Sequence, residues 1–271
     1  MVQQRFQDAL DRFVSGNLDE LGLYVETEWE TRWVWPYENY LPVLRVCRKY
    51  HIPLVALSLN SEVLSKVKAE GGIENLSAEE MRAHIGDPAA FVTISKLPAF
   101  KRYISEIITP SYASHYRRGL LPNTANFASF YTARVLRDEA MATCTVQAMQ
   151  ANPDAVMLCL MGSDHVKFEY GVKARIEAQL LGIERRANKA REAEGVSPVL
   201  QPPPKLRSVM LNPGPADAYD PRDKSLKLEM AVEGNPVPIA DYLWFSSVAD
   251  AKPRRRVREW VLPPVEFLTA M

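Results

Sequence analysis

The stretch LCLMGSDHVKFEYGV, residues 158–172, decides the predicted fold, because an apolar run ends there and polar residues follow at once. Residues 155–162 are continuously apolar, which is typical of a strand buried on both faces of a parallel sheet. We expect Gly162 to let the backbone turn at the end of that strand. Ligands of α/β proteins bind at the carboxyl ends of such strands, so His165 is the first candidate functional residue. The alternative is a histidine that a hydrogen bond holds at the start of a loop.

Other short apolar runs predict further strands. They cover residues 52–59, 206–213, 226–232 and 239–246, although periodicity alone does not distinguish the first run from a buried helix. Strands that alternate with helices predict an α/β fold, in which helices flank a mostly parallel sheet. We expect a single domain over 1–250 with a helical lid insertion over about 61–150, followed by a basic, proline-broken tail over 251–271.

Helices are predicted from 3.6-residue periodicity and from signals at their ends. They cover residues 3–15, 37–50, 62–70, 97–108, 125–149 and 171–181. Ser77 precedes Glu80 by three residues, which is the spacing of a capping box at a helix start. Residues 23–36 hold three tryptophans among charged residues and indicate an aromatic-rich connection without regular structure.

The balance of charge excludes one class of function. The 271 residues contain 33 basic and 33 acidic side chains, so the basic excess that is typical of nucleic-acid-binding proteins is missing. No apolar stretch approaches the roughly 18 residues that a membrane-spanning helix needs. We therefore expect neither a nucleic-acid partner nor a transmembrane segment. Fingerprints of dinucleotide binding, P-loops and serine hydrolases are missing too.

The predicted helix 125–149 carries an unusual stripe of side chains. Tyr131, Arg134, Asp138 and Met141 share one face at helical spacing, and Arg134 and Asp138 are four residues apart, as in an ion pair. A phenol, a guanidinium, a carboxylate and a thioether on one stripe could line a pocket. The alternative is an exposed helix face with an ordinary ion pair.

A second group of polar residues surrounds His115. His115 and Tyr116 lie in the segment YASHYRRG, next to two arginines. Histidine and tyrosine both ligate haem iron, and arginine pairs with carboxylates such as the haem propionates. A polar loop between helices is the alternative interpretation of this segment.

Four motifs, taken together, resemble the ChaN-like haem-binding family. They are FYTARVLRDEAMA (130–142), GSDHV (162–166), YGVKARIEAQL (170–180) and IADYLWFS (239–246). That family belongs to a wider group that includes the Tiki proteases and the erythromycin esterases. The similarity covers nearly the whole chain and is greatest to the plant and algal branch, for which a plastid location is expected.

The resemblance implies a haem- or tetrapyrrole-binding protein in haem or iron handling, rather than an enzyme. The pocket would lie between the carboxyl edge of the sheet and the helical lid, and a homodimer partner is one way to complete it. His165 is the expected iron ligand. The other expected ligand-binding residues are Asp164, Tyr131, Arg134, Asp138, Met141, Arg175, His115 and Tyr116.

One departure from the family pattern keeps two other functions open. Family members begin with a strand that carries G-E-x-H, and residues 1–16 resemble the helix that follows this unit. We therefore expect a shortened gene model, an alternative start or a decayed paralogue. One alternative function is a metal-dependent hydrolase with a divalent cation, and the other is a non-catalytic scaffold.

Overall fold

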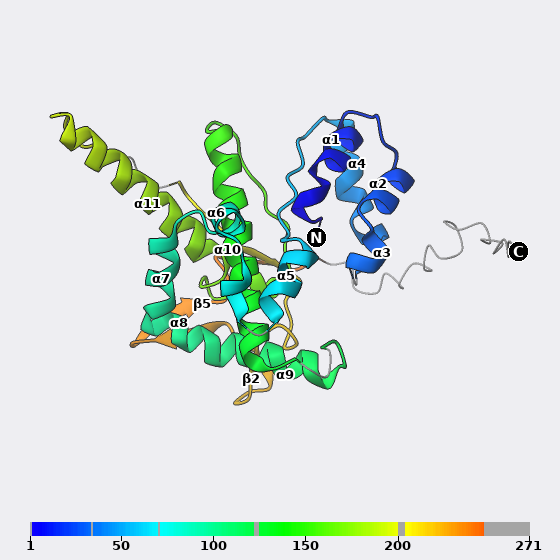
Figure 1. Cartoon of the computed structure of the whole chain (residues 1–271). Coiled ribbons are helices and arrows are strands. Elements are labelled where there is room, and N and C mark those ends of the chain that lie inside the picture. Colours follow the sequence, from blue (N-terminus) through cyan, green and yellow to red (C-terminus); the bar gives the residue numbers. More distant parts are fainter. Residues whose placement is uncertain (1, 34, 70, 122–124, 200–203, 247–271) are drawn as a thin grey trace, which may run out of the picture. The chain divides into compact units, whose positions relative to one another are not determined.

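The computed structural model describes residues 2–33, 35–69, 71–121, 125–199 and 204–246, and it divides into two compact units (Figure 1). The first unit ends at Ala56, and the second runs from Leu57 to Ser246. Each unit is described by itself. The tail predicted over 251–271 lies outside the described residues, and the single domain predicted over 1–250 stays a prediction.

The first unit is built from short helices. These are η1 (Gln4–Phe6), α1 (Gln7–Val14), α2 (Glu20–Glu26), α3 (Trp29–Arg32), η2 (Tyr37–Asn39) and α4 (Leu41–Lys49). The expectation that residues 23–36 lack regular structure was wrong. The Asp19 side chain accepts a hydrogen bond from Gly22 N and so caps α2. The buried Trp29 then anchors α3 by packing against Tyr37 and donating from Nε1 to the Trp35 carbonyl at 2.9 Å.

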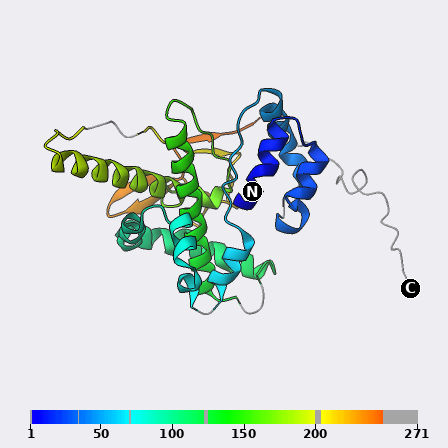
Figure 2. The same ribbon diagram turned by 45° about the horizontal axis from the view of Figure 1, so that its top comes forward.

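Helices also dominate the second unit (Figure 1). They are α5 (Ser61–Lys68), η3 (Gly72–Asn75), α6 (Ala78–His84), α7 (Pro88–Lys96), α8 (Pro98–Tyr103), the π-helical η4 (Ile104–Ile108), α9 (Thr109–Arg117), α10 (Phe127–Ala151), η5 (Ser163–His165) and α11 (Val172–Ala193). The capping box of Ser77 and Glu80 is confirmed at the start of α6. Helix α11 continues well beyond the predicted end at residue 181, and Figure 2 shows its C-terminal part extending away from the rest of the unit.

The strands form three small two-stranded sheets, and in the described residues only one of them is parallel, so the predicted mostly parallel sheet is reduced to one pair of strands. β1 (Val209–Leu211) pairs in parallel with β6 (Tyr242–Trp244). β2 (Tyr219–Asp220) pairs with β3 (Ser225–Leu226), and β4 (Glu229–Val232) pairs with β5 (Asn235–Pro238), both in antiparallel register. The fold is therefore a mixture of helices and small sheets.

Neither of the apolar runs 52–59 and 155–162 becomes one of the strands of these sheets. Val156 and Leu158 are 98% and 82% exposed, although the run was expected to be buried on both faces. An apolar run becomes a buried strand only when neighbouring strands satisfy its backbone. Among the described residues, no sheet neighbour supplies those hydrogen bonds to residues 156–161.

Helix α10 is the centre of the second unit and is buried on several sides. Leu136 packs with Leu64 and Val67 of α5. Met141 packs with Ile176 of α11. A buried ion pair supplements this apolar packing, because Arg175 Nη1 of α11 donates to Glu139 Oε2 of α10 at 2.8 Å.

We predict that Arg175→Ala lowers the free energy of unfolding by about 3–5 kcal/mol, because removing one partner of a buried ion pair leaves the other charge unpaired. The guanidinium also lies 5.5 Å from the rings of Phe91 and Phe100, and those contacts would be lost as well. Urea unfolding followed by circular dichroism measures the change. Arg185→Ala, an exposed position on the same helix, is the matched control and should change stability by less than about 0.5 kcal/mol. Equal stability of the two variants would contradict the prediction.

Candidate functional site

His165 and Asp138 form the centre of the candidate site. The His165 Nδ1 atom makes a short hydrogen bond with Asp138 Oδ1, which links the loop after residue 162 to the middle of α10. Arg134 Nε donates to the other carboxylate oxygen, Asp138 Oδ2, at 3.1 Å. Asp138 and Arg134 are buried, whereas the His165 side chain keeps 15% of its surface exposed. The expected ion pair of Arg134 and Asp138 is therefore present, but on a buried face rather than an exposed one.

Asp164 connects this centre to two further helices. Its carboxylate accepts hydrogen bonds from Ser111 Oγ of α9 at 2.7 Å and from Lys167 Nζ at 2.5 Å. Its carbonyl oxygen accepts from Tyr103 Oη of α8 at 3.0 Å and also from Arg134 Nη2. The backbone next to His165 is thus fixed from several sides.

A tight turn brings His165 back toward α10. Phe168 and Glu169 have left-handed backbone conformations, with φ of 58° and 66°. Phe168 is fully buried, and its backbone N donates to the Ile239 carbonyl at 2.9 Å. A Cβ atom on Gly171 would lie 2.3 Å from the His165 carbonyl oxygen, so only glycine fits there. Gly162 has an ordinary extended conformation, with φ of −64° and ψ of 147°, so the expectation that it makes the turn was wrong.

The electrostatics fix the charge states of the pair. Burial opposes the charge on Asp138, but Arg134 and then His165 outweigh burial and lower the pKa of Asp138 to about 2. Burial, followed by the charge of Arg134, lowers the pKa of His165 below its ordinary value. At neutral pH the carboxylate is therefore ionised and the imidazole neutral. Nδ1–H donates to Asp138, and Nε2 keeps its lone pair.

The other predicted site residues are not part of this network. Met141 is a core residue between α10 and α11. Tyr131 stacks on Phe127 and is only partly buried. Arg175 pairs with Glu139 in the core. In α9, His115 Nδ1 hydrogen-bonds the Ser111 carbonyl at 2.8 Å, and Tyr116 is 61% exposed.

The residues that contact Asp164, namely Tyr103, Ser111 and Lys167, were not predicted from the sequence. Lys167 lies within the motif that was quoted first, so its spacing of three residues from Asp164 was a usable signal. Tyr103 and Ser111 are separated from Asp164 by 61 and 53 residues, and no local pattern points to them. Only the three-dimensional packing of α8 and α9 against the loop brings them there.

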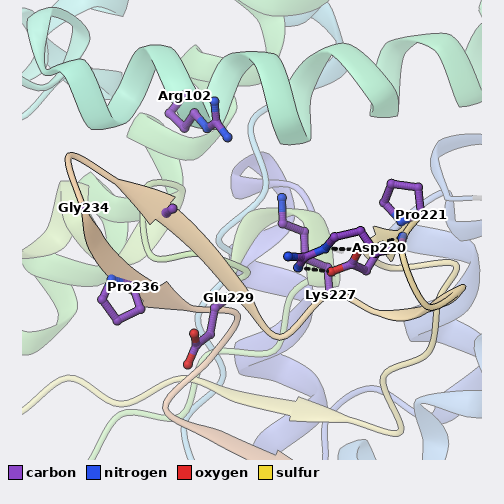
Figure 3. Close-up of a pocket in the computed structure, with 9 residues that line it drawn as sticks. Arg102, Asp220, Pro221, Lys227, Glu229, Gly234 and Pro236 are labelled. Atoms are coloured by element: carbon purple, nitrogen blue, oxygen red, sulfur yellow. Dashed lines mark hydrogen bonds and ion pairs between the residues drawn. The ribbon is translucent and has the colours of Figure 1, made fainter.

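A cavity of about 520 Å³ lies elsewhere in the second unit (Figure 3). It is lined by Arg102, Asp220, Pro221, Arg222, Lys227, Glu229, Ala231, Gly234 and Pro236, none of which is a predicted site residue. Arg222 is hydrogen-bonded to Asp220, with a distance of 2.6 Å between Nη2 and Oδ2. Lys227 is also neutralised, by Glu106. The cavity therefore presents cations that already have acidic partners.

Within the described ranges, no three His, Cys, Asp or Glu side chains converge in a way that could hold a metal ion. The helices in the same ranges include none with the length and apolar character needed to cross a membrane. The divalent-cation alternative stays a prediction.

Comparison with known proteins gives one curated relative and one family. RETICULATA-RELATED 5, a chloroplastic protein of Arabidopsis thaliana, is 27% identical over 250 residues, which make up 91% of this chain and 28% of that protein. The chain thus spans little more than a quarter of the length of this relative. No solved structure matches the chain. The sequence model of the family described as haem-binding uptake, Tiki superfamily, ChaN, matches residues 1–176. This match confirms the resemblance, and the chain belongs to the ChaN family of the Tiki superfamily.

Proposed function

We propose that this chain binds haem or a related tetrapyrrole, and that His165 Nε2 is an axial ligand of the iron. The observation that carries the proposal is the hydrogen bond between His165 Nδ1 and the ionised Asp138. A histidine that ligates a metal usually donates its other ring nitrogen to a carboxylate or carbonyl, which fixes the tautomer and the ring orientation. The family description, haem-binding uptake, supports the same ligand.

The two ring nitrogens of His165 differ in their contacts. Nε2 has no hydrogen-bond partner among the described residues, whereas Nδ1 is fixed. The hydrogen bond from Ser111 to Asp164 joins α9 to the His165 loop. His115, the second candidate ligand, also belongs to α9. The His115 ring packs against Phe130 of α10, with 5.6 Å between the ring centroids.

The wider biological role rests on the comparisons. The Arabidopsis relative is a chloroplastic protein, which supports a plastid location for this chain. A part in haem or iron handling agrees with the family description. A homodimer that completes the ligand pocket, and a lid formed by helices of residues 61–150, are further parts of this proposal.

We predict that His165→Ala weakens haemin binding at least tenfold, because the iron loses its nitrogen ligand. Haemin titration followed by the Soret band measures the affinity and, from the band position, the ligation. His51→Asn, at an exposed position of the first unit whose left-handed backbone asparagine tolerates, is the matched control and should leave the band position unchanged. If the band instead moves in His115→Ala and stays in place in His165→Ala, the assignment of the iron ligand is wrong.

We predict that Asp138→Asn weakens haemin binding by about 10–100-fold while His165 is still present, because the imidazole loses its charged partner. Asparagine also removes the nearer of the two carboxylates that contact Arg134, so we expect a loss of several kcal/mol of folding stability. Urea unfolding measures the loss of stability, and haemin titration without urea measures the affinity of the folded protein, so the two effects are separated. Asp154→Asn, an exposed position after α10, serves as control. Unchanged binding in Asp138→Asn would exclude a role for this carboxylate in ligand binding.

A further inference from the structure

One face of the parallel sheet of β1 and β6 is apolar and uncovered. Four side chains lie on this face, in two cross-strand pairs, which are Val209 with Tyr242 and Leu211 with Trp244. All four are between 49% and 67% exposed. Met210 and Leu243, the pair between them, point to the opposite face and pack in the core. Parallel sheets are almost always covered on both faces, so within the described ranges this sheet lacks one of its covers.

The apolar run before the His165 loop adds a second strip of exposed side chains. Exposure alternates along residues 156–161, with the two-residue period of a strand. Cys159 Sγ lies 3.8 Å from Thr145 Oγ1 of α10, and Met161 packs in the cluster of α10 and α11. Val156 and Leu158 alternate with these inward side chains and therefore point away from α10.

The run lies next to β1. Ser163 Oγ donates to Asp217 Oδ1 at 2.6 Å, which joins the end of the run to the loop after β1. Leu206, just before β1, packs in the same apolar cluster as the end of the run. Met210 of β1 packs in the cluster that contains Val135 of α10, so the uncovered face of β1 also points away from α10. The two strips together are called the open face, which consists of Val156, Leu158, Val209, Leu211, Tyr242 and Trp244.

The open face is large enough to form the core of a protein interface. An aromatic side chain buries about 150–250 Å² when it is covered, so Tyr242 and Trp244, roughly 60% exposed, offer about 200–300 Å². The aliphatic side chains bring the open face to several hundred Å², which is the size that marks interaction sites on monomers. A standard interface buries about 800 Å² on each partner, and its centre is apolar.

The charge of the chain favours a second copy as the partner. The 33 basic and 33 acidic residues cancel, so two copies have no net charge to drive them apart. Residues 155–163 contain no charged side chain, although charged side chains normally keep exposed strands from pairing with another chain. A strongly charged partner would find no complementary group on the open face, whereas a second apolar face is complementary to it.

We propose that the open face is the docking surface for a second copy of this chain. In a two-fold dimer each open face would meet the other, so that the apolar side chains of both copies leave water together. The inference rests on the proposed function for the homodimer and deepens it by naming the surface that joins the two copies. No open-face residue takes part in the hydrogen bonds of His165, Asp138 and Asp164, so the two proposals can be tested apart.

Analytical ultracentrifugation of the full chain without haemin tests the docking surface. The buffer contains a thiol reductant, because three free cysteines would otherwise allow disulfides between copies. We expect the parent chain to dimerise reversibly with a Kd on the order of 10 μM, since the open face is smaller than a whole standard interface. A parent chain that stays monomeric up to about 100 μM overturns the proposal.

A charge placed in the open face should disrupt the dimer. We expect Leu211→Glu to raise the Kd at least about tenfold, because each copy then brings a carboxylate into the apolar interface. Val92→Glu is the matched control, since Val92 is an exposed apolar residue of α7 outside the open face, and its Kd should equal that of the parent. Circular dichroism checks that both variants fold. An unchanged Kd in Leu211→Glu would mean that the copies meet through another surface.

Mixing variants of opposite charge tests whether the open face meets itself. Leu211→Glu and Leu211→Lys should each dimerise weakly, whereas their mixture should dimerise more tightly than either alone, because opposite charges then face each other. A mixture that associates no more tightly than its components contradicts a face-to-face dimer.

Haemin titration of the parent chain keeps the docking surface separate from the ligand. If the parent chain dimerises through the open face but binds no haemin, the docking surface stands and the proposed function falls. If the parent chain binds haemin but stays monomeric, the docking surface falls and haem binding stands without the homodimer.

Discussion

The carboxylate of Asp138 is the constraint on which the candidate site depends. It is buried in the middle of α10, and each oxygen has a different partner, Arg134 on its own helix and His165 from the loop. Burial opposes the ionisation of a carboxylate, and the contacts with Arg134 and His165 outweigh it. The ionised carboxylate in turn decides which nitrogen of His165 carries the proton. The packing of the His165 loop against α10 and the tautomer of His165 therefore depend on the same buried carboxylate.

Helix α10 carries core contacts on some sides of its axis and the candidate site on another. Leu136 faces α5, and Glu139 reaches Arg175 on α11. Arg134 and Asp138, four residues apart, face the loop that carries His165. A helix buried on several sides can hold such groups rigidly, because neighbours restrict their rotamers. This rigidity is what a ligand site needs to hold its contacts in one geometry.

The sequence predicted what depends on local spacing and failed where distant partners decide. The extent of α10, the capping box of α6 and the Arg134–Asp138 pair all follow from contacts within a few residues. The run 155–162 has the composition of a buried strand, but a strand also needs neighbours, which composition does not provide. Met141 fits the stripe of Asp138 by spacing, yet the packing of α11 makes it a core residue. Tyr103 and Ser111 could not be predicted for the same reason, since only tertiary packing brings them to Asp164.

The two arginines of α10 illustrate why identical residues on one helix can differ in their contacts. Arg134 is four residues from Asp138, so its side chain lies over that carboxylate and is neutralised. Arg137 is adjacent to Asp138 in sequence, and neighbouring side chains of a helix point about 100° apart. It is therefore turned away from the carboxylate that its neighbour uses, and both oxygens of that group are already taken. Arg134 is paired with Asp138 for this reason, whereas the buried Nε atom of Arg137 has no hydrogen-bond acceptor among the described residues.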